Sequence, residues 1–153
     1  MKRLLTPLFL LALVAGFTAS CNNASKIIAT GLKGELTGIN CASDGTVTAT
    51  WRVTNDNVVA YLFSRVSSKI FLNGTLVGLL VNENPEGIPA NTTVERSGKV
   101  KVGDESARRA LAAAKEKGTA SYMVDTQVTV TLYGDEFEKI TLTHTGTVPV
   151  TAK

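Results

Sequence analysis

Residues 46–54 alternate strictly between polar and apolar side chains, and this pattern constrains the fold more than any other. Val47, Ala49, Trp51 and Val53 are the apolar positions, and threonine or arginine stands between them. A period of two places the apolar side chains on one face of a β-strand. The 153 residues also include 20 threonines and 16 valines, which suit a pleated sheet better than a helix. A predominantly helical protein is therefore not expected.

Further strands are predicted along the rest of the chain. Their expected ranges are 27–40, 65–72, 75–81, 93–102, 128–132 and 140–148. The pair Asn73-Gly74 stands between two apolar runs, which predicts a tight hairpin turn. Residues 82–92 contain two prolines and a glycine, so we expect a loop there. Residues 58–63 form an apolar run in which Leu62 and Phe63 are expected to lie in the core.

One segment has the period of a helix, at residues 105–117. Asp104 is placed to cap its first turn, and Gly118 to end it. The apolar stripe along it consists of Ala107, Ala110, Leu111 and Ala114. About seven strands with one helix predict an all-β fold, an antiparallel β-sandwich.

The first twenty residues have the form of an export signal. Lys2 and Arg3 precede an apolar stretch at 4–17, which is shorter than the ~20 residues that a membrane-spanning helix needs. Residues 18–21 (TASC) resemble a bacterial lipobox, although Thr18 stands where leucine is usual. We therefore expect a signal peptide at 1–20, a tether at 21–26 and a folded domain at 27–153.

The lipobox resemblance implies a lipid on the sulfur of Cys21 and anchoring of the domain to a membrane. Asn22, rather than aspartate, follows the cysteine, which implies an exported lipoprotein of the outer membrane that faces the periplasm. The alternative is ordinary secretory cleavage, which leaves Cys21 free to pair with Cys41. If Cys21 is lipidated, Cys41 is expected to be a small buried apolar residue.

Composition argues against several classes of function. Removal of residues 1–20 leaves 14 basic and 13 acidic residues, a net charge of +1. The remaining chain has no basic cluster with interleaved aromatics, so nucleic-acid binding is not expected. One histidine and two cysteines make a structural zinc site improbable. We expect no metal and no cofactor.

Four strings, in this order, resemble the late embryogenesis abundant (LEA) type 2 family, also called the WHy (water stress and hypersensitive response) domain. They are residues 51–57 (WRVTNDN), 71–74 (FLNG), 77–79 (VGL) and 87–93 (GIPANTT). The predicted helix then precedes the last hairpin, as in the family. Asp56 departs from the family pattern, which has proline in the Asn-Pro-Asn turn.

The resemblance implies a fibronectin-III or immunoglobulin-like sandwich and a role in desiccation, osmotic or cold stress. It implies no catalytic residues. The residues that match the family's structural turns are Asn55, Asn57, Asn73, Gly74, Gly78 and Pro89.

No group of residues has the pattern of an active site. His144 is in phase with Ile140 and Leu142, so we expect a partly buried histidine whose hydrogen bonds are satisfied. No serine lies in a Gly-x-Ser-x-Gly context. The carboxylates Asp135, Glu136 and Glu138 are expected on a solvated turn. The chain is not expected to be an enzyme.

Three functions are consistent with these observations. The first is a membrane-anchored stress-protection protein that shields unfolded or drying proteins and membranes. The second is an envelope module that binds one protein partner through residues 58–63 or 82–91. The third is a binder of a small apolar ligand.

Overall fold

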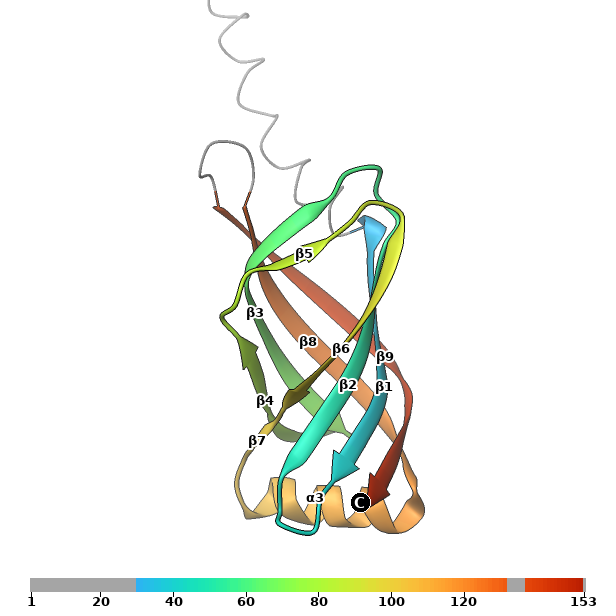
Figure 1. Ribbon diagram of the computed structural model, residues 1–153. Helices are drawn as coiled ribbons and strands as arrows, with labels where there is room; N and C mark the ends of the chain where they lie inside the picture. Colours follow the sequence, from blue (N-terminus) through green and yellow to red (C-terminus); the bar gives the residue numbers. More distant parts are fainter. Residues whose placement is uncertain (1–29, 132–136, 153) are drawn as a thin grey trace, which may run out of the picture.

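The computed structural model describes residues 30–131 and 137–152, which form nine strands and the helix α3 (Figure 1). In chain order the elements are β1 (Leu32–Cys41), β2 (Val47–Asn55), β3 (Tyr61–Leu72), β4 (Thr75–Asn82), β5 (Glu86–Ile88), β6 (Thr92–Lys99), β7 (Lys101–Val102), α3 (Glu105–Lys117), β8 (Thr119–Thr131) and β9 (Phe137–Ala152). The predicted all-β class with a helix at 105–117 is confirmed.

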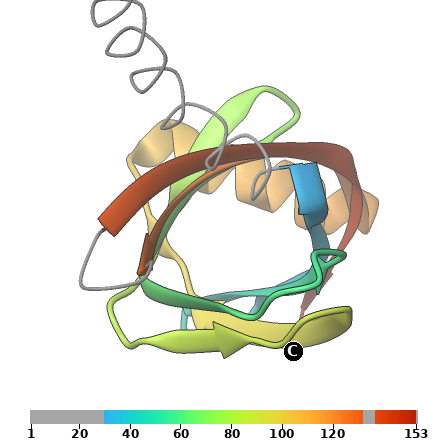
Figure 2. The same ribbon diagram turned by 90° about the horizontal axis from the view of Figure 1, so that it is seen from above.

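The strands form one strongly curled sheet in the order β6-β2-β1-β9-β8-β3-β4-β7, with β5 paired to β3. Figure 2 shows the two halves of the sheet facing each other across the interior. All pairings are antiparallel except that of β1 with β9, where Ile39–Cys41 run parallel to Val150–Ala152. This parallel pairing joins the first and last strands and was not predicted from the sequence.

The expected strand at 93–102 is divided at Val100. Its first part, β6, pairs with β2 at one edge of the sheet, and its second part, β7, pairs with β4 at the other edge. Val100 is buried between them, and its N–H donates to the Val47 carbonyl. The chain therefore crosses between the two edges here, and this crossing keeps the sheet curled.

The helix α3 lies across one end of the curled sheet (Figure 1). The Asp104 carboxylate accepts a hydrogen bond from the Ala107 N–H at 3.1 Å, and Gly118 ends the helix in the left-handed conformation with φ 73°. Ala107, Leu111 and Ala114 are buried against the strands. The predicted caps and apolar stripe are thus confirmed. They could be predicted from the sequence because both depend on residues close in the chain.

The buried apolar residues form two clusters. The larger lies nearer α3 and includes Leu36, Ile39, Ile70, Leu80 and Leu111. The smaller consists of Leu32, Tyr61, Phe63, Ile88, Val128, Val130 and Ile140. The interior is therefore divided into two clusters of buried apolar residues.

Two sequence predictions about the interior are wrong. Leu62 is 46% exposed, whereas its neighbour Phe63 is 3% exposed; adjacent residues of a strand face opposite sides. The expected loop at 82–92 contains the short strand β5, which pairs with β3. The two prolines flank β5 without interrupting it, so its N–H groups remain free to pair.

The acidic turn expected at 135–138 lies outside the residues whose side chains are described.

Candidate functional site

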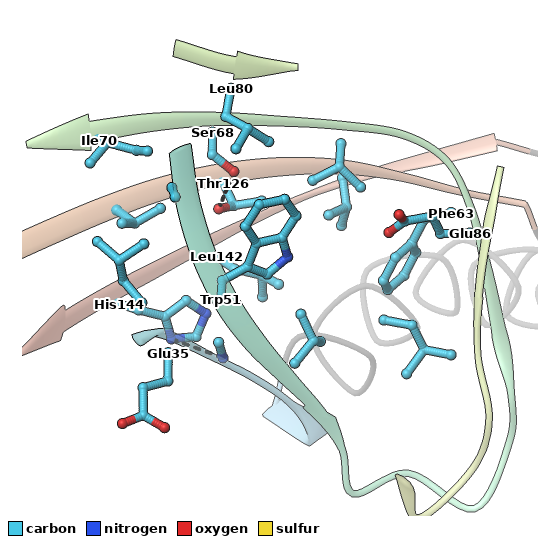
Figure 3. A pocket seen from close by; sticks show the side chains of 18 residues that line it. Glu35, Trp51, Phe63, Ser68, Ile70, Leu80, Glu86, Thr126, Leu142 and His144 are labelled. Atoms are coloured by element: carbon cyan, nitrogen blue, oxygen red, sulfur yellow. Dashed lines mark hydrogen bonds between the residues drawn. The ribbon is translucent and has the colours of Figure 1, made fainter. Parts of the chain in front are cut away.

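A cavity of about 70 Å³ lies between the two facing halves of the sheet, and residues of both core clusters line it. Most of its lining is apolar, including Leu36, Trp51, Phe63, Ile70, Leu80 and Val128. Figure 3 shows Trp51, Phe63, Ile70 and Leu80 among the side chains that line it, on different strands. An apolar lining with a few polar groups is typical of small-molecule sites, while the volume is below their usual ~300–1,000 Å³.

His144 of β9 is the most unusual polar residue in this lining. Its Nδ1 accepts a long hydrogen bond of 3.4 Å from the backbone N–H of Gly34. Its Nε2 is buried and has no hydrogen-bond partner among the described residues. Burial lowers the pKa of the imidazole below its ordinary value. The prediction of a partly buried histidine is confirmed, but the prediction that its hydrogen bonds are satisfied is wrong for Nε2.

The imidazole fits here because Gly34 has no side chain. A Cβ at Gly34 would lie 2.7 Å from Cδ2 and 2.8 Å from Nε2 of His144. In this part of β1 no backbone pairing with β9 is present, and side chains accept from the N–H groups of β1 instead. Next to His144, the Tyr122 hydroxyl accepts from the N–H of Leu36 at 3.2 Å.

Three other polar side chains of the lining, Ser68, Thr126 and Glu86, have partners. The hydroxyls of Ser68 and Thr126 are hydrogen-bonded to each other at 2.9 Å. Glu86 accepts from Asn82 Nδ2 at 2.8 Å and lies 3.7 Å from Arg96 Nε. The Glu86 side chain is 22% exposed, so the cavity approaches solvent beside it. His144 Nε2 differs from these three side chains in having no partner within the described part of the chain.

The six residues matched to the family's structural turns do not line the cavity. Asn73 and Gly74 lie between β3 and β4, whereas Gly78 lies within β4 and Asn55 ends β2. Asn55 is 0% exposed: its Nδ2 donates to the carbonyls of Val59, Ile88 and Pro89, and its Oδ1 accepts from the N–H of Asn57. This one side chain joins the end of β2 to the segment after β5.

Asn73 and Gly74 form the turn between β3 and β4, both with positive φ. Asn73 Oδ1 also accepts from the N–H and hydroxyl of Ser121, at 3.1 and 2.9 Å. Gly78 lies in β4 opposite Val102 of the paired strand β7, and a Cβ there would approach the Lys101 carbonyl oxygen to 2.6 Å. These contacts connect the β3–β4 hairpin to its neighbours in space.

The two cysteines differ in what the structure says of them. Cys21 lies outside the described residues. Cys41 is a free thiol, partly buried against the larger core cluster, and burial raises its pKa, with a smaller opposing effect of Lys115.

Within the described ranges, no three His, Cys, Asp or Glu side chains are placed to hold a metal ion. No helix of the described chain has the length and apolar character needed to cross a membrane.

Sequence reasoning missed the cavity. The one available signal was the period-two phase that directed His144 inward together with Leu142. Its unpaired Nε2 could not be inferred, because its surroundings come from strands that are distant in sequence.

No protein-family model and no curated protein matches the sequence. The fold is similar to the solution structure of AT1g01470 from Arabidopsis thaliana, with a TM-score of 0.52 and 16% identity over 78% of each chain. It is also similar to the solution structure of a putative late embryogenesis abundant protein, At2g46140.1, with a TM-score of 0.50 and 12% identity over 88% of this chain and 77% of that one. At these identities the likeness is one of fold.

Proposed function

We propose that this chain is a non-enzymatic stress-protection protein, anchored to a membrane of the cell envelope through Cys21. The observation that carries the proposal is the fold shared with a putative late embryogenesis abundant protein. The sequence motifs at 51–57, 71–74, 77–79 and 87–93 agree with it.

The outer surface of the domain supports this role. Its ion pairs join exposed or half-exposed side chains of opposite charge, such as Arg52 with Glu35 and Glu95. The exposed positions of β6 are Thr93, Glu95, Ser97 and Lys99, and most of those described in β9 are threonines. Exposed pairs of this kind add little stability, but a hydrated surface of mixed charge stays soluble and resists association. Such a domain can separate other macromolecules as water is withdrawn.

A lipid on Cys21 would hold this surface close to the membrane. Each buried CH₂ contributes about 0.8 kcal/mol, so two or three acyl chains suffice for stable anchoring. The tether would then place the domain beside the envelope proteins and lipids it protects. A Cys21→Ala variant is expected to leave the membrane fraction of cells, whereas a Cys41→Ala variant is expected to stay there.

Drying tests the protective role directly. A labile reporter enzyme is dried with the 22–153 fragment, and its recovered activity is compared with that after drying with an inert protein of equal mass. Clear protection at substoichiometric ratios is expected. Recovery no better than with the inert protein would contradict the proposal.

Partner binding is a second candidate, favoured by three exposed apolar side chains near the start of β3. Val58, Val59 and Leu62 are 85%, 44% and 46% exposed, and exposed apolar groups that lie near one another are typical of interaction sites. Crosslinking in cells through position 58 should then give one product with a single partner at a stoichiometric ratio. Leu62→Ser should lower the yield of this product. A ladder of abundant unrelated proteins would contradict this candidate.

A further inference from the structure

We propose that the cavity between the two core clusters binds a small, uncharged, mostly apolar molecule with one acceptor oxygen, held by a hydrogen bond from His144 Nε2–H. This inference goes beyond stress protection and does not depend on it. It rests on the contacts of His144 and on the size and lining of the cavity.

The hydrogen-bond direction follows from the partner of the other ring nitrogen. The backbone N–H of Gly34 can only donate, so Nδ1 of His144 accepts and carries no proton. In the neutral ring the proton must then be on Nε2, and burial favours the neutral ring. The structure therefore presents a buried N–H donor that has no acceptor among the described residues. Leaving such a donor unpaired is unfavourable, so a ligand that supplies an acceptor gains affinity.

The cavity limits the ligand's size and charge. Its volume of about 70 Å³ exceeds the ~10–15 Å³ that one water needs and is below the ~150 Å³ of an engineered cavity that binds benzene. A molecule of a few non-hydrogen atoms suits this volume. Trp51, Phe63 and Leu80 would contact its apolar part, and Glu86 in the lining disfavours an anion. A ketone, ether or alcohol oxygen meets these conditions.

Two probes of almost equal shape separate the hydrogen bond from simple filling of space. They are 2-butanone and 2-methyl-1-butene, which carry C=O and C=CH₂ at the same position. Trp51 is the one tryptophan of the chain and lines the cavity, so its indole N–H signal in a ¹H–¹⁵N NMR spectrum reports binding without ambiguity. The purified 153-residue chain is titrated with each probe to obtain two dissociation constants.

The preference for the ketone is the dissociation constant of the alkene divided by that of the ketone. We expect this ratio to be about tenfold larger for the wild-type chain than for His144→Phe, because a tenfold difference corresponds to the free energy of one hydrogen bond. Thr145→Ala is the matched control, because Thr145 is the next residue on β9 and is exposed. It should keep the wild-type ratio. An unchanged ratio in His144→Phe would overturn the proposal. It would also be overturned if neither probe binds, because water alone would then accept the hydrogen bond from Nε2–H.

A second measurement needs no variant and does not depend on how His144→Phe folds. His144 is the one histidine of the chain, so its imidazole Nε2–H proton can be assigned directly. That signal should move downfield with 2-butanone and remain in place with 2-methyl-1-butene. Equal shifts with both probes, or no shift with either, would overturn the assignment of Nε2 as the donor.

Discussion

The backbone N–H of Gly34 on β1 donates to Nδ1 of His144 on β9 over 3.4 Å, where no backbone pairing joins these two strands. The paired part of β1 and β9 is confined to Ile39–Cys41 and Val150–Ala152. Earlier along β1, an imidazole takes the place of a backbone carbonyl. This arrangement places a titratable side chain inside an apolar sheet, with the second ring nitrogen of His144 facing the cavity.

A methyl group at Gly34 should disturb this arrangement. The Gly34→Ala Cβ would lie 2.7 Å from the imidazole, and crowding of a packed interior costs about 1–3 kcal/mol. We therefore expect Gly34→Ala to lower the free energy of unfolding, measured by urea denaturation, by this amount. Gly38→Ala is the control on the same strand, because its Cβ would meet nothing nearer than Thr50 at 4.0 Å; it should change stability by less than about 0.5 kcal/mol. Equal effects of the two substitutions would contradict the role of Gly34.

Stability should fall as the pH decreases below the ordinary histidine pKa. Burial lowers the pKa of His144 in the folded chain below the 6.5 of an exposed imidazole. The unfolded chain therefore binds more protons below that pH, and the unfolding free energy rises with pH in this range. The stabilisation is complete above pH ~6.5 and declines as the pH falls from there toward the folded pKa.

Urea unfolding at several pH values between about 7.5 and 5.5, on either side of the histidine pKa, measures this effect. One proton gives at most about 1.4 kcal/mol per pH unit. The slope should be absent in His144→Phe and present in Thr145→Ala. A wild-type chain whose stability increases toward the lower pH would show that the imidazole is protonated in the folded state.

Asn55→Asp should destabilise the fold strongly. The Asn55 amide Nδ2 donates to three carbonyl oxygens at 2.9–3.3 Å, and the side chain is fully buried. A carboxylate in its place would meet these oxygens with no proton to donate, at a cost of about 3–5 kcal/mol near neutral pH. Thermal unfolding would measure the loss. Asn84→Asp, on an exposed residue, controls for the added charge and should be nearly neutral; comparable losses would exclude the proposed role of the three carbonyls.

Gly74→Ala should weaken the β3–β4 hairpin through backbone strain alone. Gly74 has φ 83°, and a Cβ would meet no atom within 4 Å. The left-handed conformation costs an L-residue about 1–2 kcal/mol. Gly87→Ala, equally free of contacts but without positive φ, should leave stability within about 0.5 kcal/mol of wild type. Chemical denaturation of the two variants tests this, and a neutral Gly74→Ala would refute it.

The features read correctly from the sequence are those that depend on neighbours along the chain. The caps at Asp104 and Gly118 and the turn conformation of Asn73 and Gly74 each follow from the chemistry of a few adjacent residues. The alternation at 46–54 assigned a strand with an inward Ala49. Local hydrogen bonding, backbone sterics and side-chain period suffice for such features.

The sequence did not predict the features that depend on which strands meet. Leu62 belongs to an apolar run, yet it faces solvent because the pairing of β3 fixes which of two adjacent residues points inward. The prolines near β5 suggested a loop, and only the approach of β3 makes that segment a strand. A one-residue change of register would exchange the inward and outward residues of β3.

Periodicity and local propensity are properties of short segments, and they were enough to predict an all-β fold with one capped helix at 105–117. The parallel pairing of β1 with β9, the division of the core into two clusters and the cavity between them arise only in the folded chain. The same is true of His144 Nε2, which has no partner among the described residues. Burial and hydrogen-bond satisfaction depend on atoms from strands far apart in the chain, and the positions of these atoms are fixed only when the sheet curls upon itself.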